Sequence, residues 1–204
     1  MCNLYRLTNS ADEVAKFFVA AARDVRVIPG NSASEVYPGY LGLVLAEGAL
    51  RPMAWGFPLV LTGAKGQKLK PRPVNNARSD KLATAFWSAS FRARRCLIPV
   101  SAYAEAQGPK GAMTRTWFSL PDAPLMAVAG LWRDTDEWGA AYAMVMTSAN
   151  TQTSAVHQRM PVILDPTGWE GWLSDDPQAA HDLCRPYGGQ LTITPTDEPW
   201  AARR

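Results

Sequence analysis

The sequence predicts an α+β fold with a mostly antiparallel, barrel-like β-sheet core and flanking helices. Short apolar runs bounded by turn residues recur through the middle of the chain, which is typical of antiparallel strands. The 204 residues include 16 Pro and eight Trp, and this composition favours strands and structured loops over a helical bundle. Helical periodicity is confined to short stretches near the two ends and at one place between them.

The length and composition fit one domain. Apolar residues make up 47% of the chain and charged residues 19%, and a chain of this length buries roughly 70% of its unfolded surface in a single core. The sequence contains no internal repeat and no low-complexity segment. We therefore expect a single domain over residues 1–204. A monomer is expected as well, although the sequence does not fix the oligomeric state.

The N-terminal segment predicts a strand followed by a helix. Met1 to Leu7 is a short apolar lead-in, which we expect to anchor the N-terminus in the body of the fold as a strand. Ser10 and Glu13 stand three residues apart as a capping box, so a helix begins there. Apolar residues then recur on one helical face at Val14, Phe17, Phe18 and Ala21.

Most of the remaining chain is predicted to form strands. Pro38 and Gly39 mark the turn before the first of them. In chain order these strands cover residues 41–45, 51–56, 96–100, 103–106, 116–120, 125–131, 142–146, 161–164 and 191–194. From Phe57 onward we expect a long loop rich in Gly, Lys and Pro, and loops of this length are usually functional or disordered.

Three further helices are expected on the outside of the sheet. The longest runs from Ser79 to Arg92 and turns Leu82, Phe86 and Ala89 towards the core. Two short helices follow near the end of the chain, at residues 169–173 and 178–184.

Basic residues are unevenly distributed along the chain. The net charge of +3 permits an anionic partner but does not require one. The basic residues gather in two stretches, the first with Lys65, Lys68, Lys70, Arg72 and Arg78 and the second with Arg92, Arg94 and Arg95. If both stretches border one cleft, they form a basic wall suited to a polyanion. The alternative is that both are solvated faces of a loop and a helix.

The cysteine and hydropathy patterns exclude several classes of protein. Cys2, Cys96 and Cys184 form no C-x-x-C pair and leave one cysteine over, which supports neither a disulfide framework nor a zinc site. We therefore expect no metal, no cofactor and a reducing, cytoplasmic location. No segment approaches the ~18 continuous apolar residues of a membrane span.

Cys2 is the most informative residue for chemistry. A small side chain at this position permits removal of the initiator Met, which leaves a free α-amine beside a thiol. An α-amine, with a reference pKa of ~7.7–8.0, is partly neutral near neutral pH and adds to an aldehyde as a Schiff base. The thiol then closes a five-membered thiazolidine ring. Cys2 alone is a weak signal, since any small residue can follow Met1.

Three other positions carry groups suited to catalysis or binding. His157 directly precedes an apolar strand and is either an acid/base group or a capping histidine. Glu105 interrupts an apolar strand and is either a proton-transfer group or an outward-facing strand residue. The segment Asn75-Asn76-Ala77-Arg78 precedes a predicted helix and forms either a clamp for an anion or a terminal amine, or an ordinary turn with a helix N-terminus.

Taken together, motifs along the chain resemble those of one family. They are Met1-Cys2, Trp55-Gly56, Asn76-Ala77-Arg78 with Asp80, Arg95 to Pro99, the strand of Glu105, Ala129 to Trp132, Thr147 to Asn150, and His157 to Leu164. In order and spacing they are similar to those of the SRAP family, the SOS-response-associated peptidase-like proteins. The resemblance implies a pseudo-barrel α+β fold.

The resemblance also implies a chemistry. SRAP proteins bind single-stranded DNA and capture the ring-opened aldehyde of an abasic site as a covalent DNA–protein crosslink. Cys2 would be the nucleophile and Asn76 would orient its amine, while Glu105 and His157 would move the protons of ring opening and Schiff-base formation. The family name records a thiol autopeptidase activity, which would remove Met1.

The same resemblance assigns residues that contact DNA. Arg78 would hold a flanking phosphate, and Trp55 and Arg159 would belong to the DNA-binding surface. The Gly-Arg pair that usually follows the cysteine in the family is replaced here by Asn3-Leu4, so Arg6 is expected to supply the basic contact.

Two other functions remain open from the sequence. The first is an N-terminal-nucleophile cysteine hydrolase, in which Cys2, His157 and Glu105 cleave an amide. The second is a catalytically idle DNA-binding module. A DNA oligomer that carries an aldehyde separates all three, because only aldehyde capture produces an adduct that survives denaturation.

Overall fold

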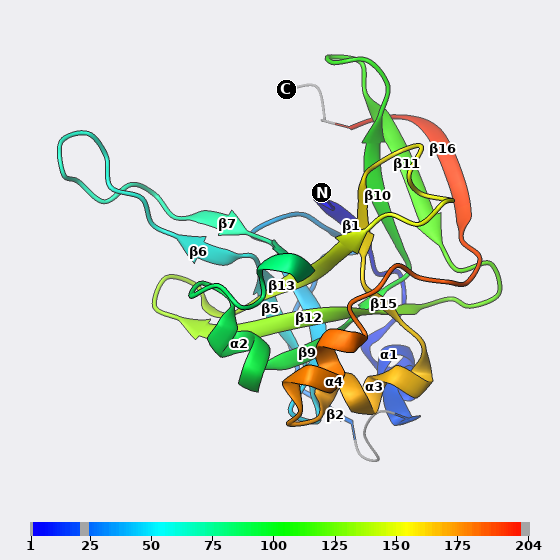
Figure 1. Ribbon diagram of the computed structural model, residues 1–204, viewed down its shortest axis with the longest axis horizontal. Coiled ribbons are helices and arrows are strands. Elements are labelled where there is room, and N and C mark those ends of the chain that lie inside the picture. The colour runs from blue at the N-terminus through cyan, green and yellow to red at the C-terminus, as the bar shows by residue number, and fades with distance from the viewer. Residues whose placement is uncertain (1, 21–24, 201–204) are drawn as a thin grey trace.

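The fold is α+β, as the sequence predicts, and consists of a closed barrel, a second sheet and a projecting hairpin (Figure 1). The computed structural model describes residues 2–20 and 25–200. Met1 of the predicted first strand and Ala21 of the predicted first helix lie outside these ranges. In the described part of the chain, no helix has the length and apolar character needed to cross a membrane.

Five strands close into a barrel. They are β4 (Leu41–Ala46), β5 (Ala49–Trp55), β9 (Arg95–Val100), β12 (Met126–Thr135) and β13 (Gly139–Ser148). Neighbours in the order β13-β12-β9-β4-β5 pair antiparallel, and a parallel pairing of β13 with β5 closes the ring. Closure removes the exposed edges that an open sheet of these strands would have.

Short strands extend the barrel sheet. They are β2 (Arg26–Val27) on β5, β8 (Asn76–Arg78) and β14 (Arg159–Pro161) on β13, and β15 (Ile163–Leu164) on β12. The predicted strand 161–164 is therefore two strands. Val162 lies between them, where its N–H donates to Val145 O (2.9 Å) and its carbonyl accepts from Ala129 N (2.9 Å).

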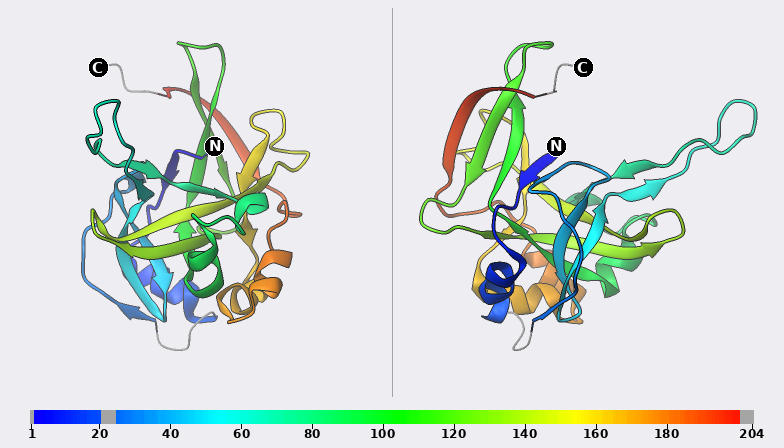
Figure 2. Two further views of the ribbon diagram at one scale, coloured as in Figure 1. Left: turned by 60° about the vertical axis from the view of Figure 1, so that its left-hand side comes forward. Right: turned by 180° about the vertical axis from the view of Figure 1, so that it is seen from behind.

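The second sheet stands against the barrel (Figure 2). Its antiparallel order is β16 (Thr192–Pro199), β11 (Thr114–Ser119), β10 (Ala102–Gln107), β1 (Leu4–Arg6) and β3 (Glu35–Val36). The predicted N-terminal strand is thus an inner strand of this sheet. Only Ser101 separates β9 of the barrel from β10, so the chain passes directly from one sheet to the other.

Residues 57–74, which we name the arm, form a hairpin that projects from the body of the molecule (Figures 1 and 2). Strands β6 (Phe57–Leu59) and β7 (Arg72–Val74) pair antiparallel at its base. Pairing continues outward through a bridge between Thr62 and Lys68 and a hydrogen bond from Leu69 N to Leu61 O (2.8 Å). The long loop expected here is therefore an ordered hairpin, whose Gly, Lys and Pro content hides the usual alternation of a strand.

The helices cover one end of the barrel (Figure 1). They are α1 (Ala11–Phe17) with the 3-10 turn η1 (Phe18–Ala20), η2 (Ser79–Lys81), α2 (Ser88–Ala93), α3 (Pro166–Leu173) and α4 (Pro177–Asp182). The predicted capping box of α1 is confirmed, since Glu13 N donates to Ser10 Oγ (3.3 Å) and Ser10 N donates to Glu13 Oε2 (2.7 Å). The two short C-terminal helices are confirmed with slightly shifted ends.

The prediction of one helix over residues 79–92 is wrong. The segment forms η2, then turns, and only afterwards α2. The Thr84 hydroxyl donates to the Lys81 carbonyl (2.7 Å), a local bond that competes with the helical ladder. Phe86 and Trp87 then pack against Phe57 at the base of the arm, with ring centroids 6.2 and 5.3 Å away. Tertiary contacts of these two aromatic rings override the helical periodicity.

A tyrosine pair ties the second sheet to the barrel. Tyr5 of β1 and Tyr142 of β13 are fully buried, and their hydroxyl groups are hydrogen-bonded to each other. Gly42 of β4 lies against both hydroxyls, so closely that an added Cβ would overlap them. This close approach explains why a glycine stands inside a barrel strand.

Replacing Gly42 by Ala should therefore destabilise the fold. Overpacking a filled core typically costs about 1–3 kcal/mol of unfolding free energy. Urea denaturation of the variant should show a lower midpoint than the unmodified protein. Gly188→Ala is the matched control, because an added Cβ there meets no atom within 4 Å. Equal midpoints for Gly42→Ala and the control would contradict close packing at this position.

Candidate functional site

The site is built around Cys2, directly before strand β1. The Cys2 side chain is fully buried, and its thiol donates to the carbonyl of Leu4 (3.5 Å). Its backbone carbonyl accepts two hydrogen bonds, from Asn75 Nδ2 (3.0 Å) and from Asn76 Nδ2 (2.7 Å). The residue expected to react is therefore held by two amide side chains, from Asn75 directly after the arm and from Asn76 at the start of β8.

The barrel positions these two asparagines. Strand β8 pairs parallel with β13, with Asn76 opposite Met144. The carbonyl of Asn75 accepts from Met144 N (2.9 Å) and from the indole of Trp55 (3.1 Å). Asn75 stands beside Asn76 in the clamp that the sequence allows, but the sequence alone does not show that both amides turn to one carbonyl.

Trp55 does not occupy the position that a DNA contact requires. The side chain is fully buried in the barrel, where it packs edge-on against Tyr5 with ring centroids 5.1 Å apart. A fully enclosed indole cannot stack on a base. The predicted DNA contact is therefore corrected: Trp55 supports Asn75 from inside the core.

Glu105 and His157 come together, as the sequence predicts. Glu105 lies on β10 with a buried side chain, and His157 lies in the turn between β13 and β14. Glu105 Oε1 is 3.9 Å from His157 Nδ1, which also accepts a hydrogen bond from the backbone N–H of Arg159 (3.0 Å). The histidine is partly exposed, with 30% of its side chain accessible, so the pair connects the buried interior with the surface.

Burial governs the protonation of this site. It raises the pKa of the Glu105 carboxyl above its usual value, while the neighbouring His157 opposes the shift. Burial also raises the pKa of the Cys2 thiol, and the Glu105 carboxylate raises it further. The thiol is therefore protonated near neutral pH, and Cys2 and Glu105 are close enough to influence each other electrostatically.

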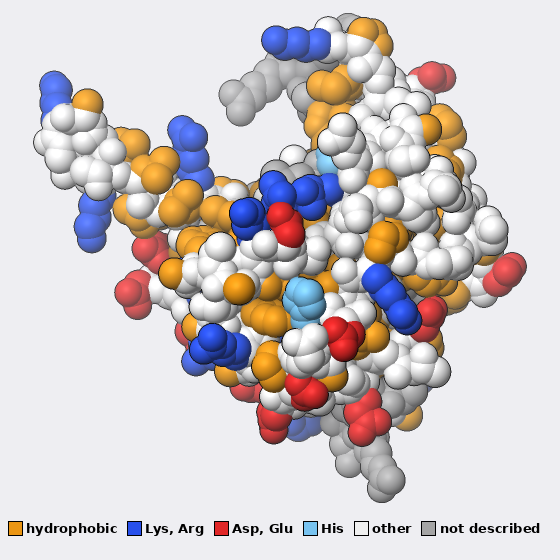
Figure 3. All heavy atoms as spheres, viewed as in Figure 1, with side chains coloured by type: hydrophobic (Ala, Val, Ile, Leu, Met, Phe, Trp, Pro, Cys, Tyr) orange, Lys and Arg blue, Asp and Glu red, His pale blue; other side chains and the backbone are white. Residues whose placement is uncertain are grey.

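Arg78 and Arg159 lie on the outer side of the site. Arg78 on β8 forms an ion pair with Asp80 (2.6 Å), and Arg159 on β14 is 3.8 Å from the other oxygen of the same carboxylate. Both guanidinium groups are partly exposed. Figure 3 shows Lys and Arg side chains gathered around an acidic one near the middle of this face. Two arginines sharing one carboxylate leave a net positive charge at the edge of the site.

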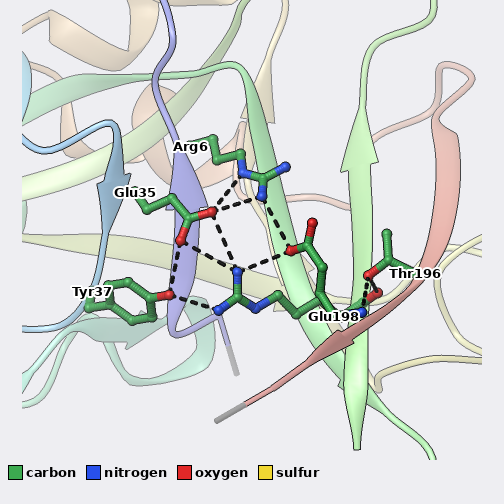
Figure 4. Close-up of polar contacts among 6 residues, drawn as sticks. Arg6, Glu35, Tyr37, Thr196 and Glu198 are labelled. Carbon is green, nitrogen blue, oxygen red and sulfur yellow. Dashed lines mark hydrogen bonds and ion pairs between the residues drawn. The ribbon is translucent and has the colours of Figure 1, made fainter. Parts of the chain in front are cut away.

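Arg6 differs from these two arginines because its charge is fully compensated (Figure 4). Its guanidinium donates to Glu35 (2.8 and 2.9 Å) and to Glu198 (3.3 Å), and it lies over the ring of Trp117 at 3.8 Å. Arg115 contacts the same two carboxylates. The prediction that Arg6 supplies a basic DNA contact is therefore corrected: the residue joins strands β1, β3 and β16.

Two arginines of the second basic stretch are not free to form part of a basic wall. Arg95 is buried and donates to backbone carbonyls, including those of Trp172 (2.6 Å) and Arg92 (3.0 Å). Arg94 lies 3.6 Å from Asp134. This second basic stretch lies at the end of α2 and the start of β9, whereas most of the first stretch lies on the arm.

An open cavity of about 630 Å³, which we name the aromatic groove, begins beside Cys2. Its lining includes Asn3, Tyr37, Tyr40, Pro73, Asn75 and Trp200. Asn75 Nδ2 donates both to Cys2 O and to Asn3 Oδ1 (3.1 Å), so the groove shares a residue with the site. More than half of the Tyr40 side chain is exposed. These residues come from four separate segments, and no local signal in the sequence brings them together.

The described ranges of the chain contain no set of side chains suited to bind a metal ion. Residues 2–20 and 25–200 contain no group of three or more His, Cys, Asp or Glu side chains arranged to hold a metal ion. Cys2, Cys96 and Cys184 are free thiols.

The chain matches one protein family along nearly its whole length. Residues 1–198 match the family described as SOS response associated peptidase (SRAP). This chain belongs to the SRAP family. The SRAP motifs recognised in the sequence include Cys2, Asn76, Glu105 and His157, which the fold brings to one site.

Solved structures share the fold of this SRAP protein. A protein from Bacteroides thetaiotaomicron superposes with a TM-score of 0.76 at 17% identity, covering 95% of this chain and 91% of the other. A protein from Bordetella bronchiseptica has a TM-score of 0.76 at 22% identity, covering 96% and 99%. At these identities the similarity establishes the fold.

Two relatives carry functional names. "Abasic site processing protein YoqW" of Bacillus subtilis is 30% identical over 151 residues, which are 68% of this chain and 64% of that protein. "Abasic site processing protein YMR114C" of Saccharomyces cerevisiae is 29% identical over 133 residues, 63% of this chain and 36% of that protein. The match thus spans less than two thirds of the length of each relative.

Proposed function

We propose that this SRAP protein processes abasic sites by capturing the ring-opened aldehyde in single-stranded DNA as a covalent thiazolidine on Cys2. The observation that carries the proposal is the placement of Cys2: two asparagine amides hold its carbonyl, and the Glu105–His157 pair lies within electrostatic reach. The names of two relatives support abasic-site DNA as the substrate.

Removal of Met1 frees the amine on which this chemistry depends. Asn76 is suited to orient that amine, because its Nδ2 already holds the Cys2 carbonyl. Its Oδ1 is buried and has no hydrogen-bond partner among residues 2–20 and 25–200. An amine on the same residue is a fitting donor for this acceptor, and the bond would satisfy an otherwise costly buried oxygen.

The protonated thiol determines the order of events. A neutral thiol is a weak nucleophile, so the amine attacks the aldehyde carbon first. The adduct loses one water to give a Schiff base. The sulfur then bonds to the same carbon and its proton passes to the nitrogen, which closes the ring. The sequence releases one water and requires no oxidant, reductant or metal.

Glu105 and His157 are suited to the proton transfers in these steps. The raised pKa of Glu105 lets its carboxyl donate a proton to the departing oxygen at a pH where an exposed glutamate is ionised. His157, 3.9 Å away and partly exposed, is placed to exchange protons between this carboxyl and solvent. Opening of the abasic sugar ring requires the same kind of transfer.

The protonated thiol also weighs against the hydrolase alternative. A cysteine hydrolase needs a thiolate, and its cysteine normally has a lowered pKa. Here burial and the Glu105 carboxylate both act in the opposite direction. Aldehyde capture begins with the amine and tolerates a protonated thiol.

An aldehyde-bearing oligomer tests the proposal. The protein, with removal of Met1 confirmed by intact mass, is incubated with single-stranded DNA that contains one abasic site. A species that survives heat and denaturant, with the mass of protein plus DNA minus one water, is expected. Absence of any stable adduct on protein that lacks Met1 would overturn aldehyde capture and favour the idle DNA-binding module.

Binding of unmodified single strands should weaken as salt rises. Each phosphate contact contributes roughly −0.7 to the slope of log affinity against log salt. Arg78→Ala should make the slope shallower by about that amount, because the Arg78 guanidinium is partly exposed beside the site. Fluorescence anisotropy between about 50 and 200 mM salt measures the slope. Arg185→Ala, an exposed arginine after α4, is the control and should leave it unchanged. An unaltered slope in Arg78→Ala would exclude this residue as a phosphate contact.

A further inference from the structure

The arm carries a dense and uniform positive charge. Its four basic residues are Lys65, Lys68, Lys70 and Arg72, and no Asp or Glu occurs between Phe57 and Ser79. All four side chains are exposed. Within the described ranges of the chain, none of the four forms an ion pair.

The basic residues of the arm therefore differ from the arginines near the site, whose charges are paired with carboxylates. Arg78 and Arg159 share Asp80, and Arg6 and Arg115 both contact Glu198. Those charges are at least partly neutralised by neighbouring carboxylates. The cations of the arm repel one another and stabilise nothing that the structure describes, so the arm has the electrostatic character of a surface for a polyanion.

The arm also lacks a hydrophobic core of its own that would stabilise a hairpin of this length. An isolated two-stranded hairpin is only marginally stable in water. Beyond the paired strands at its base, the arm exposes Leu61 and Leu69, with 42% and 41% of their surface accessible. Figure 3 shows hydrophobic side chains lying between the basic ones along the arm. Basic side chains with apolar surface between them are suited to bind a single DNA strand, which offers phosphates and the faces of sugars and bases.

The base of the arm is firmly connected to the reactive residue. Gly56 adopts a positive φ of 122°, and an added Cβ would lie 2.5 Å from the Pro73 ring, so the two strands of the arm approach closely there. Strand β7 ends one residue before Asn75, which holds the carbonyl of Cys2. Pro73 and Asn75 also line the aromatic groove. A strand leaving Cys2 through the groove would therefore meet the base of the arm.

We propose that the arm is a second DNA-binding element, which holds backbone phosphates several nucleotides away from the abasic site reacting at Cys2. This inference rests on the proposed function for the identity of the partner. From Leu59 to Lys65 at its tip the arm spans six residue steps, or at most roughly 20 Å at about 3.3 Å per residue. At the B-form spacing of about 3.4 Å per phosphate this reach equals roughly six nucleotides, and fewer when the strand is stretched.

The proposal predicts a dependence on DNA length. Strands of about 20 nucleotides should bind more tightly than strands of about three, which are too short to occupy the site and the arm together. The arm variant Lys65→Ala/Lys68→Ala/Lys70→Ala should lose this advantage while binding the short strand normally. Its salt slope on the long strand should be shallower by about two, so that its loss of affinity between about 50 and 200 mM salt is roughly twentyfold smaller.

A matched control removes the same charge elsewhere. Lys16→Ala/Arg26→Ala/Arg185→Ala also deletes three exposed basic residues, which lie on α1, on β2 and after α4. Fluorescence anisotropy with unmodified single strands of both lengths compares the three proteins, and thermal melting verifies that each is folded. Equal losses in the arm and control variants would reduce the effect to net charge and overturn the proposal. So would an arm variant that keeps the length dependence, the result expected if an acidic protein is the partner of the arm.

The readout separates this inference from the covalent chemistry. Binding of unmodified DNA requires no crosslink, whereas crosslinking is measured on a short abasic strand at saturating protein. If wild-type protein forms no adduct yet binds long strands in an arm-dependent way, aldehyde capture fails and the arm proposal stands. If an adduct forms while the arm variant binds both lengths as wild type does, the arm proposal fails and aldehyde capture stands.

Discussion

Replacing Cys2 by Ala should abolish heat-stable attachment to abasic DNA. Alanine keeps the α-amine but lacks the thiol that closes the ring, so any Schiff base formed by the amine remains reversible by hydrolysis. Cys2→Ser should behave similarly, since a serine hydroxyl does not form the thiazolidine. Denaturing gel electrophoresis after heating measures the loss, which we expect to be complete within detection.

The control for this experiment is Cys184→Ala. Cys184 is another free thiol, half-buried beside α4, and it has no place in the proposed chemistry. This variant should form as much adduct as wild type. Intact mass must verify that Met1 is absent from all proteins compared. An undiminished heat-stable adduct in Cys2→Ala would remove Cys2 as the bonding residue and would direct attention to internal lysines.

Replacing Glu105 by Gln or His157 by Ala should slow the crosslink by a factor of ~10²–10⁴, the usual contribution of a general acid or base. The final yield should remain close to that of wild type, because both variants keep the amine and the thiol. Gln has nearly the same shape as Glu, so the buried position of Glu105 tolerates it sterically. A time course at fixed pH measures both rate and yield.

The pH profile gives an independent test of Glu105. Burial raises the pKa of its carboxyl, so the acid form persists to higher pH than in an exposed glutamate. If Glu105 acts as the acid, the wild-type rate should fall as pH rises through that raised pKa. The rate of Glu105→Gln should not show this fall with rising pH, because an amide does not titrate. Glu170→Gln, on the exposed side of α3, should retain the wild-type profile.

The crosslinking rates of Glu105→Gln and His157→Ala also distinguish aldehyde capture from amide hydrolysis. In a cysteine hydrolase, loss of the base stops turnover on an amide while aldehyde capture by the terminal aminothiol is almost unaffected. Rates equal to wild type in both Glu105→Gln and His157→Ala would remove these residues from the crosslinking mechanism. The aminothiol of Cys2 would then react by its intrinsic chemistry alone.

Local patterns in the sequence were sufficient for much of this protein. The capping box at Ser10 and the apolar runs predicted α1 and most strands, because capping and strand alternation depend on residues within a few positions of one another. The motif series around Cys2, Asn76, Glu105 and His157 predicted which residues share a site. Each of these features depends only on neighbouring residues or on the order of motifs along the chain.

Long-range contacts determined the rest. The sequence shows a basic residue at position 6, but the carboxylates that compensate Arg6 stand 29 and 192 residues away. Closure of the barrel buries Trp55, and Trp172 of α3 and Ser174 after it supply carbonyls that accept hydrogen bonds from the buried Arg95. Whether a charged or aromatic side chain faces a partner or the core depends on what the fold places against it, which no local pattern encodes.

For the functional site and the arm, too, the sequence predicted one part of the description and the tertiary structure decided the other. The sequence places a cysteine at position 2 and predicts its aminothiol chemistry. Only the tertiary structure placed two amides on the Cys2 carbonyl, buried its thiol beside Glu105 and turned the expected loop after Trp55 into a charged hairpin connected to Asn75. The reason is physical: desolvation and charge compensation are sums over all neighbours in space, and those neighbours come from distant parts of the chain.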